Sequence, residues 1–237
     1  MDSTYLVTFD LGAPVIMGPM ASFDGLLAWC AVQQALLSTS MPDYDKIHNT
    51  LPLRKIFFSE GDDDNYVYGA SNFFVESGKV VVLSKTYVNK MFPIEPAAKY
   101  LPGYRQKINL SSGFNKSYRI PFTTLSANQL LCHFSGDADA VEKLLRKWLR
   151  GIGKKTNIGF GVVKTISIEI DATANPLIFP DGEAKRVIPV YAAAALGVTQ
   201  GLDRRAPAFY RPPYAPRHPE RRVECIIPNE TRILGGY

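Results

Sequence analysis

Residues 149–161 read LRGIGKKTNIGFG and lie between a helical pattern and a strand pattern. Glycine tolerates positive φ and lets an anion approach the main chain, so consecutive N–H groups in such a loop can form an anion-binding nest. Two adjacent lysines would add positive charge, although the glycines alone would suit a structural turn. We predict that this loop contacts a nucleic-acid backbone through Arg150, Gly151, Gly153, Lys154, Lys155, Gly159 and Gly161.

The order of the elements excludes the common nucleotide-binding glycine motifs. A Walker A loop and a dinucleotide-binding loop both precede a helix, whereas residues 151–161 follow one. The chain also has no Ser-His-Asp ordering, GxSxG elbow, HExxH helix or cluster with metal-ligand spacing. Ordinary hydrolase and metalloenzyme functions therefore lack support, and we expect neither a metal nor a cofactor.

Composition predicts a folded protein in a reducing compartment. The chain has 237 residues, of which 46% are hydrophobic, and a net charge of +5 that permits an anionic partner. Cys30, Cys132 and Cys225 are far apart and form no CxxC pair, so neither a zinc knuckle nor a disulfide framework is expected. The N-terminus has no signal-peptide pattern, and the apolar stretch at 26–37 is shorter than the roughly 20 residues that cross a bilayer. We expect a cytoplasmic protein without a membrane partner.

The first half of the chain begins with a strand and a helix. Apolar and polar residues alternate over 5–11, as in a strand with one buried face. Ser22 is a plausible N-cap, and Asp24 lies in the first turn, where the helix dipole favours negative charge. We expect this helix to run to about residue 40. A β-rich section follows, with strands predicted at 55–60, 66–75 and 80–88.

The second half repeats the strand–helix–strand pattern. Residues 130–134 predict a strand, a helix begins at Asp137 or Asp139 and ends near residue 149, and residues 162–170 predict a closing strand. The whole order predicts an α+β, ferredoxin-like (RRM-like) domain over residues 1–172, with a β-rich insertion at about 53–125.

Two other segments have an unusual composition. Residues 96–136 contain no acidic residue, and their basic residues alternate with aromatic ones, a mixture that suits phosphates and stacked bases. Strands at 104–110 and 117–123 would form a projecting hairpin, although an edge hairpin whose charges only prevent aggregation is the alternative. The predicted RNA contacts there are Arg105, Lys107, Lys116 and Arg119.

The C-terminal extension, residues 173–237, becomes rich in proline and arginine past Gly201. We expect this tail to be extended and surface-bound, in contact with RNA or a neighbouring subunit.

Residues 18–28, GPMASFDGLLA, and the loop at 151–161 together resemble the CRISPR-associated RAMP superfamily. The glycine loop is typical of the superfamily as a whole. The helix start at 24–27 is more particular to the type IV effector family named Csf three, which is Cas five-like.

The resemblance implies a non-catalytic RNA-binding subunit that caps the 5′ handle of a CRISPR guide RNA (crRNA). It further implies a thumb-like hairpin, here at about 99–124, and a ribonucleoprotein complex with Cas seven-like backbone subunits and a large or small effector subunit. Such a complex serves antiviral defence by pairing the guide with invading DNA, here plasmid DNA, so contact with target DNA is possible through the complex.

Two alternatives remain from the sequence. A Cas six-type endoribonuclease would process the guide RNA, and related RAMP enzymes often place a catalytic histidine in the loop after the first helix, where His48 lies. His133 lies inside a predicted strand and is expected to be packed or hydrogen-bonded, and His218 lies in the tail. The second alternative is a structural subunit that contacts only protein.

Overall fold

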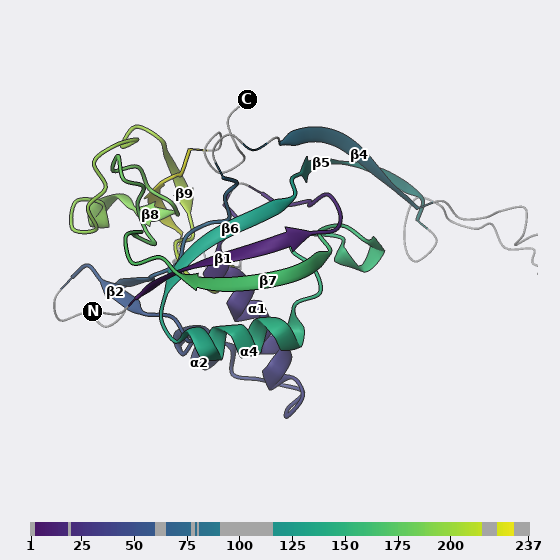
Figure 1. The fold of residues 1–237 in the computed structure, drawn as a ribbon, viewed down its shortest axis with the longest axis horizontal. Coiled ribbons are helices and arrows are strands. Elements are labelled where there is room, and N and C mark those ends of the chain that lie inside the picture. Colours follow the sequence, from purple (N-terminus) through teal and green to yellow (C-terminus); the bar gives the residue numbers. More distant parts are fainter. Residues whose placement is uncertain are drawn as a thin grey trace, which may run out of the picture. The chain divides into compact units, whose positions relative to one another are not determined.

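The computed structural model describes residues 3–18, 20–59, 65–76, 79, 81–90, 116–214 and 222–229. It divides into two compact units, one made of residues 1–82 and 125–237 and the other of residues 83–124 (Figure 1). Among the described helices, none is long and apolar enough to cross a membrane.

The larger unit is built on a three-stranded antiparallel sheet. Strand β1 (Thr4–Leu11) lies between β6 (Gln129–Ser135) and β7 (Val163–Ile170). Alternate β1 residues Val7 and Phe9 are fully buried, as the period-two pattern predicts. The three strands predicted at 5–11, 130–134 and 162–170 are thereby confirmed within a few residues.

Two helices lie on one side of this sheet (Figure 1). Helix α1 (Phe23–Ala35) buries Phe23 and Leu27, while α4 (Ala138–Trp148) buries Val141 and Leu145, one turn apart on a single stripe. The side chain of Asp137 accepts a hydrogen bond from the Ala140 N–H and so caps α4. The predicted helices are confirmed, although α1 ends before residue 40 and a separate short helix, α2 (Tyr44–Asn49), follows.

The segment between the helices forms shorter strands than we predicted. Strand β2 (Lys55–Phe57) pairs with β3 (Tyr66–Tyr68) in a two-stranded antiparallel sheet. Residues 69–74 then run along the free edge of β6, with isolated antiparallel bridges from Ala70 and Phe74. The ladder is interrupted because intervening N–H groups at 72 and 73 donate elsewhere, to the carbonyls of Lys185 and Ala21.

The C-terminal part folds into a second small core. A three-stranded antiparallel sheet has the order β8 (Ile188–Pro189), β10 (Val223–Ile226), β9 (Arg205–Ala208). The tail was expected to be extended past Gly201, but its described residues are largely packed. The tail is packed because apolar side chains of the C-terminal part bury one another in a cluster that also includes Val67. The C-terminal members are Leu177, Val187, Ile188, Ala208, Tyr210, Cys225 and Ile226.

The smaller unit is dominated by paired strands. Strand β4 (Val82–Lys90) pairs with β5 (Tyr118–Ser126), and the Ser84 and Thr124 hydroxyls lie 2.7 Å apart. The guanidinium of Arg119 lies 4.2 Å from the centre of the Tyr87 ring. The predicted strand at 104–110, with Arg105 and Lys107, lies outside the described residues, and the described partner of β5 is β4. Lys116 and Arg119 are exposed.

The described residues therefore define a mixed α/β protein with several small antiparallel sheets and few helices.

Candidate nucleic-acid interface

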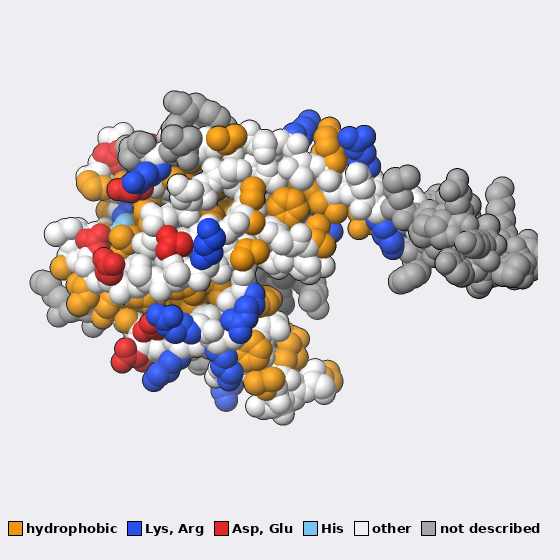
Figure 2. Space-filling view, turned by 45° about the vertical axis from the view of Figure 1, so that its right-hand side comes forward, with side chains coloured by type: hydrophobic (Ala, Val, Ile, Leu, Met, Phe, Trp, Pro, Cys, Tyr) orange, Lys and Arg blue, Asp and Glu red, His pale blue; other side chains and the backbone are white. Residues whose placement is uncertain are grey.

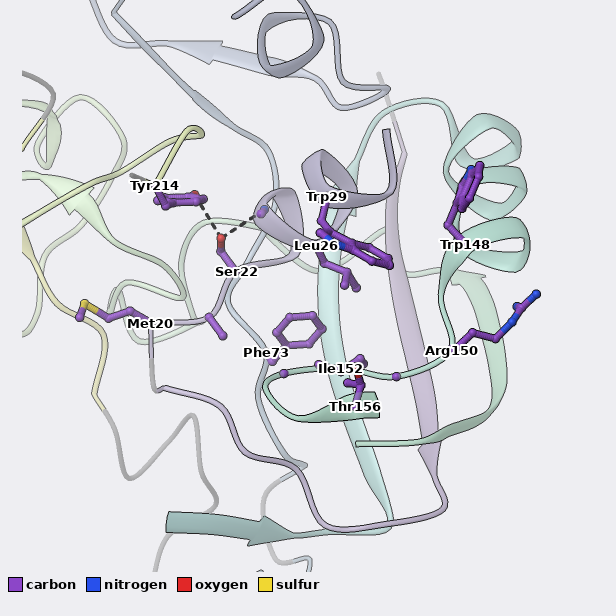
Figure 3. Close-up of a pocket in the computed structure, with 14 residues that line it drawn as sticks. Met20, Ser22, Leu26, Trp29, Phe73, Trp148, Arg150, Ile152, Thr156 and Tyr214 are labelled. Carbon is purple, nitrogen blue, oxygen red and sulfur yellow. Dashed lines mark hydrogen bonds between the residues drawn. The ribbon is translucent and has the colours of Figure 1, made fainter. Parts of the chain in front are cut away.

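A pocket of about 490 Å³ lies between the start of α1 and the glycine loop that follows α4 (Figure 3). Residues 20–29, which come before and within α1, supply one wall, and residues 148–156 supply another. Phe73 and Tyr214 complete the lining. The structure thus brings together the two segments, 18–28 and 151–161, that the sequence singles out.

The start of α1 is shaped by its cap. Ser22 has an extended backbone, and its hydroxyl accepts a hydrogen bond from the Gly25 N–H and donates one to the Tyr214 hydroxyl. A Cβ on Gly25 would lie only 3.1 Å from the Tyr214 ring. Glycine at this position therefore lets the C-terminal tyrosine approach the helix closely.

The pocket wall is mostly apolar. Leu26 and Trp29 project from α1, Phe73 lies near the middle of the group and Ile152 comes from the glycine loop (Figure 3). Trp29 remains 47% exposed, because it lines an open pocket rather than the core beneath α1.

Three of the four loop glycines have packing roles. A Cβ on Gly153 would overlap the Ile16 carbonyl oxygen, one on Gly161 would overlap the Ile152 carbonyl oxygen, and one on Gly151 would lie 2.9 Å from the Gly161 carbonyl oxygen. The loop N–H groups of Ile152, Lys154 and Gly161 donate to carbonyls of Gly161, Ile16 and Pro14 at 2.7–2.8 Å. These N–H groups hold the loop against the protein, so an anion nest would have to use other parts of it.

The outer part of the loop is open. Lys155 has φ 63° and Gly159 has φ 97°, and a Cβ on Gly159 would meet nothing within 4 Å. Lys154, Thr156 and Asn157 are exposed, and Lys155 is half-buried. The positive charge predicted for the loop therefore lies on its solvent-exposed part, at Lys154 and beside it at Lys155.

Arg150 is directed toward the helix rather than into the pocket. Its Nη1 donates to the main-chain carbonyls of Arg146 (3.4 Å) and Leu149 (3.3 Å), and so helps to terminate α4. Figure 3 shows its side chain pointing away from Phe73 and Ile152. On α4 itself, Lys143, Arg146 and Lys147 are exposed, and Figure 2 shows Lys and Arg side chains gathered in the lower part of that view.

An ionic cluster lies behind the start of α1, made of the buried Asp24 and Arg186 and of Tyr214, which is 37% exposed. Arg186 is 1% exposed and its Nη2 lies 2.9 Å from an Oδ of Asp24, which is fully buried. The Tyr214 hydroxyl donates to the same carboxylate at 2.8 and 2.9 Å. Arg186 also donates through Nη1 to the carbonyls of Tyr68 and Ala70. Burial and the adjacent Asp24 carboxylate raise the pKa of Tyr214 well above its usual range.

Sequence reasoning missed Arg186 and Tyr214. A signal for Arg186 does exist, because two adjacent cations, Lys185 and Arg186, interrupt the apolar run of residues 184–190. A charge inside such a run is expected to be buried and paired. Nothing in the sequence indicates which carboxylate it would meet.

His133 lies in a second polar cluster with Asp171 and Lys185. Its Nε2 lies 3.2 Å from Oδ2 of Asp171, and its Nδ1 lies 3.3 Å from Nζ of Lys185. Burial, helped by the positive charge of Lys185, lowers the pKa of His133 to about 4, and burial lowers the pKa of Lys185 to about 8. The expectation that His133 is packed and hydrogen-bonded is confirmed.

His48 lies in α2 and is not among the residues that line the pocket. Its main-chain carbonyl accepts a 2.6 Å hydrogen bond from the Tyr68 hydroxyl. The tail histidine at 218 lies outside the described residues. Within the described part of the chain, no group of three or more His, Cys, Asp or Glu residues could hold a metal ion.

Comparison with models of known protein families identifies the family of the chain. The family model for CRISPR type IV associated protein Csf3 matches residues 4–218, a range that includes both walls of the pocket. The protein is thus a CRISPR-associated protein of the type IV class. Within that class, the chain belongs to the Csf3 family, and the predicted resemblance to this family is confirmed. A search of curated protein sequences gives no match.

Proposed function

We propose that this chain is the non-catalytic RNA-binding subunit of a type IV CRISPR effector complex and that it caps the 5′ handle of the guide RNA. Membership of the Csf3 family supports a place in such a complex. In this proposal the domain is a ferredoxin-like RAMP fold, with β1, β6 and β7 as its sheet, α1 and α4 as its helices and residues 69–74 as an irregular fourth strand.

The observation that carries the proposal is the meeting of α1 and the glycine loop around one pocket. The loop is held in place by three main-chain hydrogen bonds, with Lys154 exposed and Lys155 half-buried beside it. Cations presented on a fixed backbone neutralise phosphates without a large ordering cost, and the resulting attraction weakens as salt rises.

We further propose Cas seven-like backbone subunits, a large or small effector subunit and, through the complex, target DNA as partners. Cas six-type processing is not favoured, because His48 contributes to α2 rather than to the pocket. His48→Ala should accordingly leave RNA cleavage by the complex unchanged. Metal-free cleavage by this chain that the substitution slows about a hundredfold would establish the enzyme instead.

The direct test reverses the charge of the loop. Lys154→Glu with Lys155→Glu, introduced into the assembled complex, should weaken binding of a crRNA tenfold or more near 0.15 M salt and lower the salt-dependence slope by roughly two. Affinity is measured by fluorescence anisotropy over a salt series. The A260/A280 ratio of the purified complex reports retained guide RNA.

A matched control reverses the charge of two exposed lysines outside the loop, in the variant Lys46→Glu with Lys79→Glu. This control has the same change in net charge and should retain most of the affinity. If the loop variant binds crRNA as tightly as the control does at moderate salt, the loop is not an RNA contact.

A further inference from the structure

We infer that the pocket between α1 and the glycine loop binds one unstacked nucleobase of single-stranded RNA. This inference rests on the proposed RNA-binding function and assigns it a base-binding site in addition to its phosphate contacts. Three properties of the pocket support it, namely its size and walls, its charge, and its polar groups.

The walls suit a planar aromatic ligand. The pocket holds about 490 Å³, within the roughly 300–1,000 Å³ range of small-molecule sites. Trp29, Trp148 and Phe73 contribute aromatic side chains, and Trp29 is half exposed at the opening. Stacking on such faces is the usual way in which proteins bind unpaired bases without depending on their sequence.

The charge suits a nucleotide rather than a neutral or cationic group. None of the described residues lining the pocket is acidic, since the nearby Asp24 carboxylate is turned into its ion pair with Arg186. Lys154 and Lys155 directly follow Gly153, which lines the pocket, whereas the Arg150 guanidinium is directed toward the end of α4. A base in the pocket would therefore place its ribose-phosphate beside the cationic loop.

Polar groups at the wall can meet the edge of a base. Thr156 lines the pocket, and within the described ranges its hydroxyl makes no hydrogen bond to another residue. The Ser22 hydroxyl also lines it, but is already bonded to Gly25 and Tyr214. One uncommitted hydroxyl beside aromatic faces predicts stacking with limited base selectivity.

An apolar side chain from a neighbouring subunit is the competing occupant. The two lysines beside the pocket and the absence of acidic residues among its described lining residues favour RNA, because a protein segment has no comparable need for adjacent positive charges at one edge. The two occupants make opposite predictions for RNA that lacks a base.

The chain provides its own reporter for the test. It contains two tryptophans, Trp29 and Trp148, and both line the pocket. Eight-nucleotide homopolymers of adenosine, cytidine and uridine are titrated into the full chain while tryptophan emission and anisotropy are recorded. The tightest binder is then resynthesised with a single abasic ribonucleotide at each position in turn. We expect one position, or two adjacent ones, at which removal of the base abolishes quenching and weakens binding about tenfold.

Substitutions in the wall provide an independent check. Trp29→Ala should lose the sensitivity to the abasic position, and Trp29→Phe should lose less because it keeps an aromatic face. Ala21→Leu should narrow the pocket without removing charge. The control is Tyr44→Ala, which truncates a 50% exposed aromatic outside the pocket. Thermal melts by circular dichroism establish that each variant is folded. The Ala21→Leu variant keeps the test valid if Trp29→Ala fails to fold.

The outcomes separate the inference from the proposed function. RNA that binds with unchanged tryptophan emission and equal tolerance of abasic sites at every position would overturn the base site, while leaving the phosphate-binding loop intact. Loss of complex assembly in Ala21→Leu, with RNA binding unaffected, would assign the pocket to a protein side chain and also overturn it. Absence of RNA binding by both the chain and the complex would overturn both.

Discussion

The two sides of the N-terminal half of α1 have opposite chemistry. On one side, Leu26 and Trp29 line an open, apolar pocket beside a cationic loop. On the other, Asp24 is fully buried against Arg186 and Tyr214. Neighbouring residues of one short motif thus serve different purposes, because consecutive helix positions point about 100° apart.

The difference between the two sides determines which substitutions should destabilise the fold. In the ionic cluster every charge is desolvated and its partners are fixed, so loss of one partner leaves a buried charge uncompensated. In the pocket the side chains contact water on one side, so truncation removes packing only in part. Substitutions in the cluster should therefore affect stability, and those in the pocket should affect binding.

The largest effect is expected for Arg186→Met, which removes the positive charge at nearly constant volume. The Asp24 carboxylate would remain buried without its counter-ion, and the carbonyls of Tyr68 and Ala70 would lose their donor. We expect the free energy of unfolding to fall by about 3–5 kcal/mol, measured by urea titration.

Arg146→Met is the matched control for this substitution. Arg146 pairs with Glu142 on the exposed face of α4, with side chains that are 60% and 41% exposed, so its loss should cost less than about 1 kcal/mol. Adding Asp24→Asn to Arg186→Met should recover part of the loss. Equal destabilisation by Arg186→Met and Arg146→Met would show that the cluster does not differ from a surface pair.

An intermediate loss of stability is expected for substitutions of the loop glycines, and it should be larger in the inner part of the loop than in the outer part. Gly161 has φ 62° and its Cβ would overlap the Ile152 carbonyl oxygen, so Gly161→Ala should cost at least about 2 kcal/mol of stability. Gly159 has φ 97° but open space around it, and Gly159→Ala should cost about 1 kcal/mol. Urea titration of both variants compares them directly. If both substitutions had the same cost, steric crowding would not distinguish the two glycines.

The most gradual effect is a dependence on pH from His133, which lies in the cluster with Asp171 and Lys185. The pKa of His133 is about 4 in the folded protein and close to 6.5 in an unfolded chain, so between these values the unfolded chain binds a proton that the folded chain does not. The contribution of His133 to stability should therefore be complete above pH 6.5 and fall as the pH is lowered, by at most about 1.4 kcal/mol per pH unit.

His133→Gln should flatten this acid slope, since glutamine does not titrate. The measurement is the free energy of unfolding of both proteins from pH 7 to pH 4.5. If their difference is constant across this range, proton uptake by His133 does not contribute.

Much of the larger unit could be predicted from periodicity. The alternation at 5–11 and the apolar stripe of Val141 and Leu145 report burial directly, because strands and helices repeat their faces at fixed intervals. The loop at 151–161 could be predicted because its residues lie between the end of a helical pattern and the start of a strand pattern. The separate helix α2 was missed, although Asp43 caps it with a hydrogen bond to the Lys46 N–H.

The C-terminal region was harder to predict. Proline and arginine suggested an extended tail past Gly201, yet β9 and β10 pair there and bury Ala208 and Cys225. Strands of four residues carry little periodic signal. Their pairing depends on partners distant in sequence, and no local pattern encodes those partners.

By itself, the sequence determined the order of the main strands and helices, the cationic glycine loop and the family to which the chain belongs. These features are local, and neighbouring residues specify them. Only the tertiary structure decided that Asp24 is an interior ion-pair partner while Trp29 faces a pocket. That outcome depends on Arg186 and Tyr214, which lie 162 and 190 positions from Asp24. Contacts over such separations form only when packing of the whole unit brings the segments together.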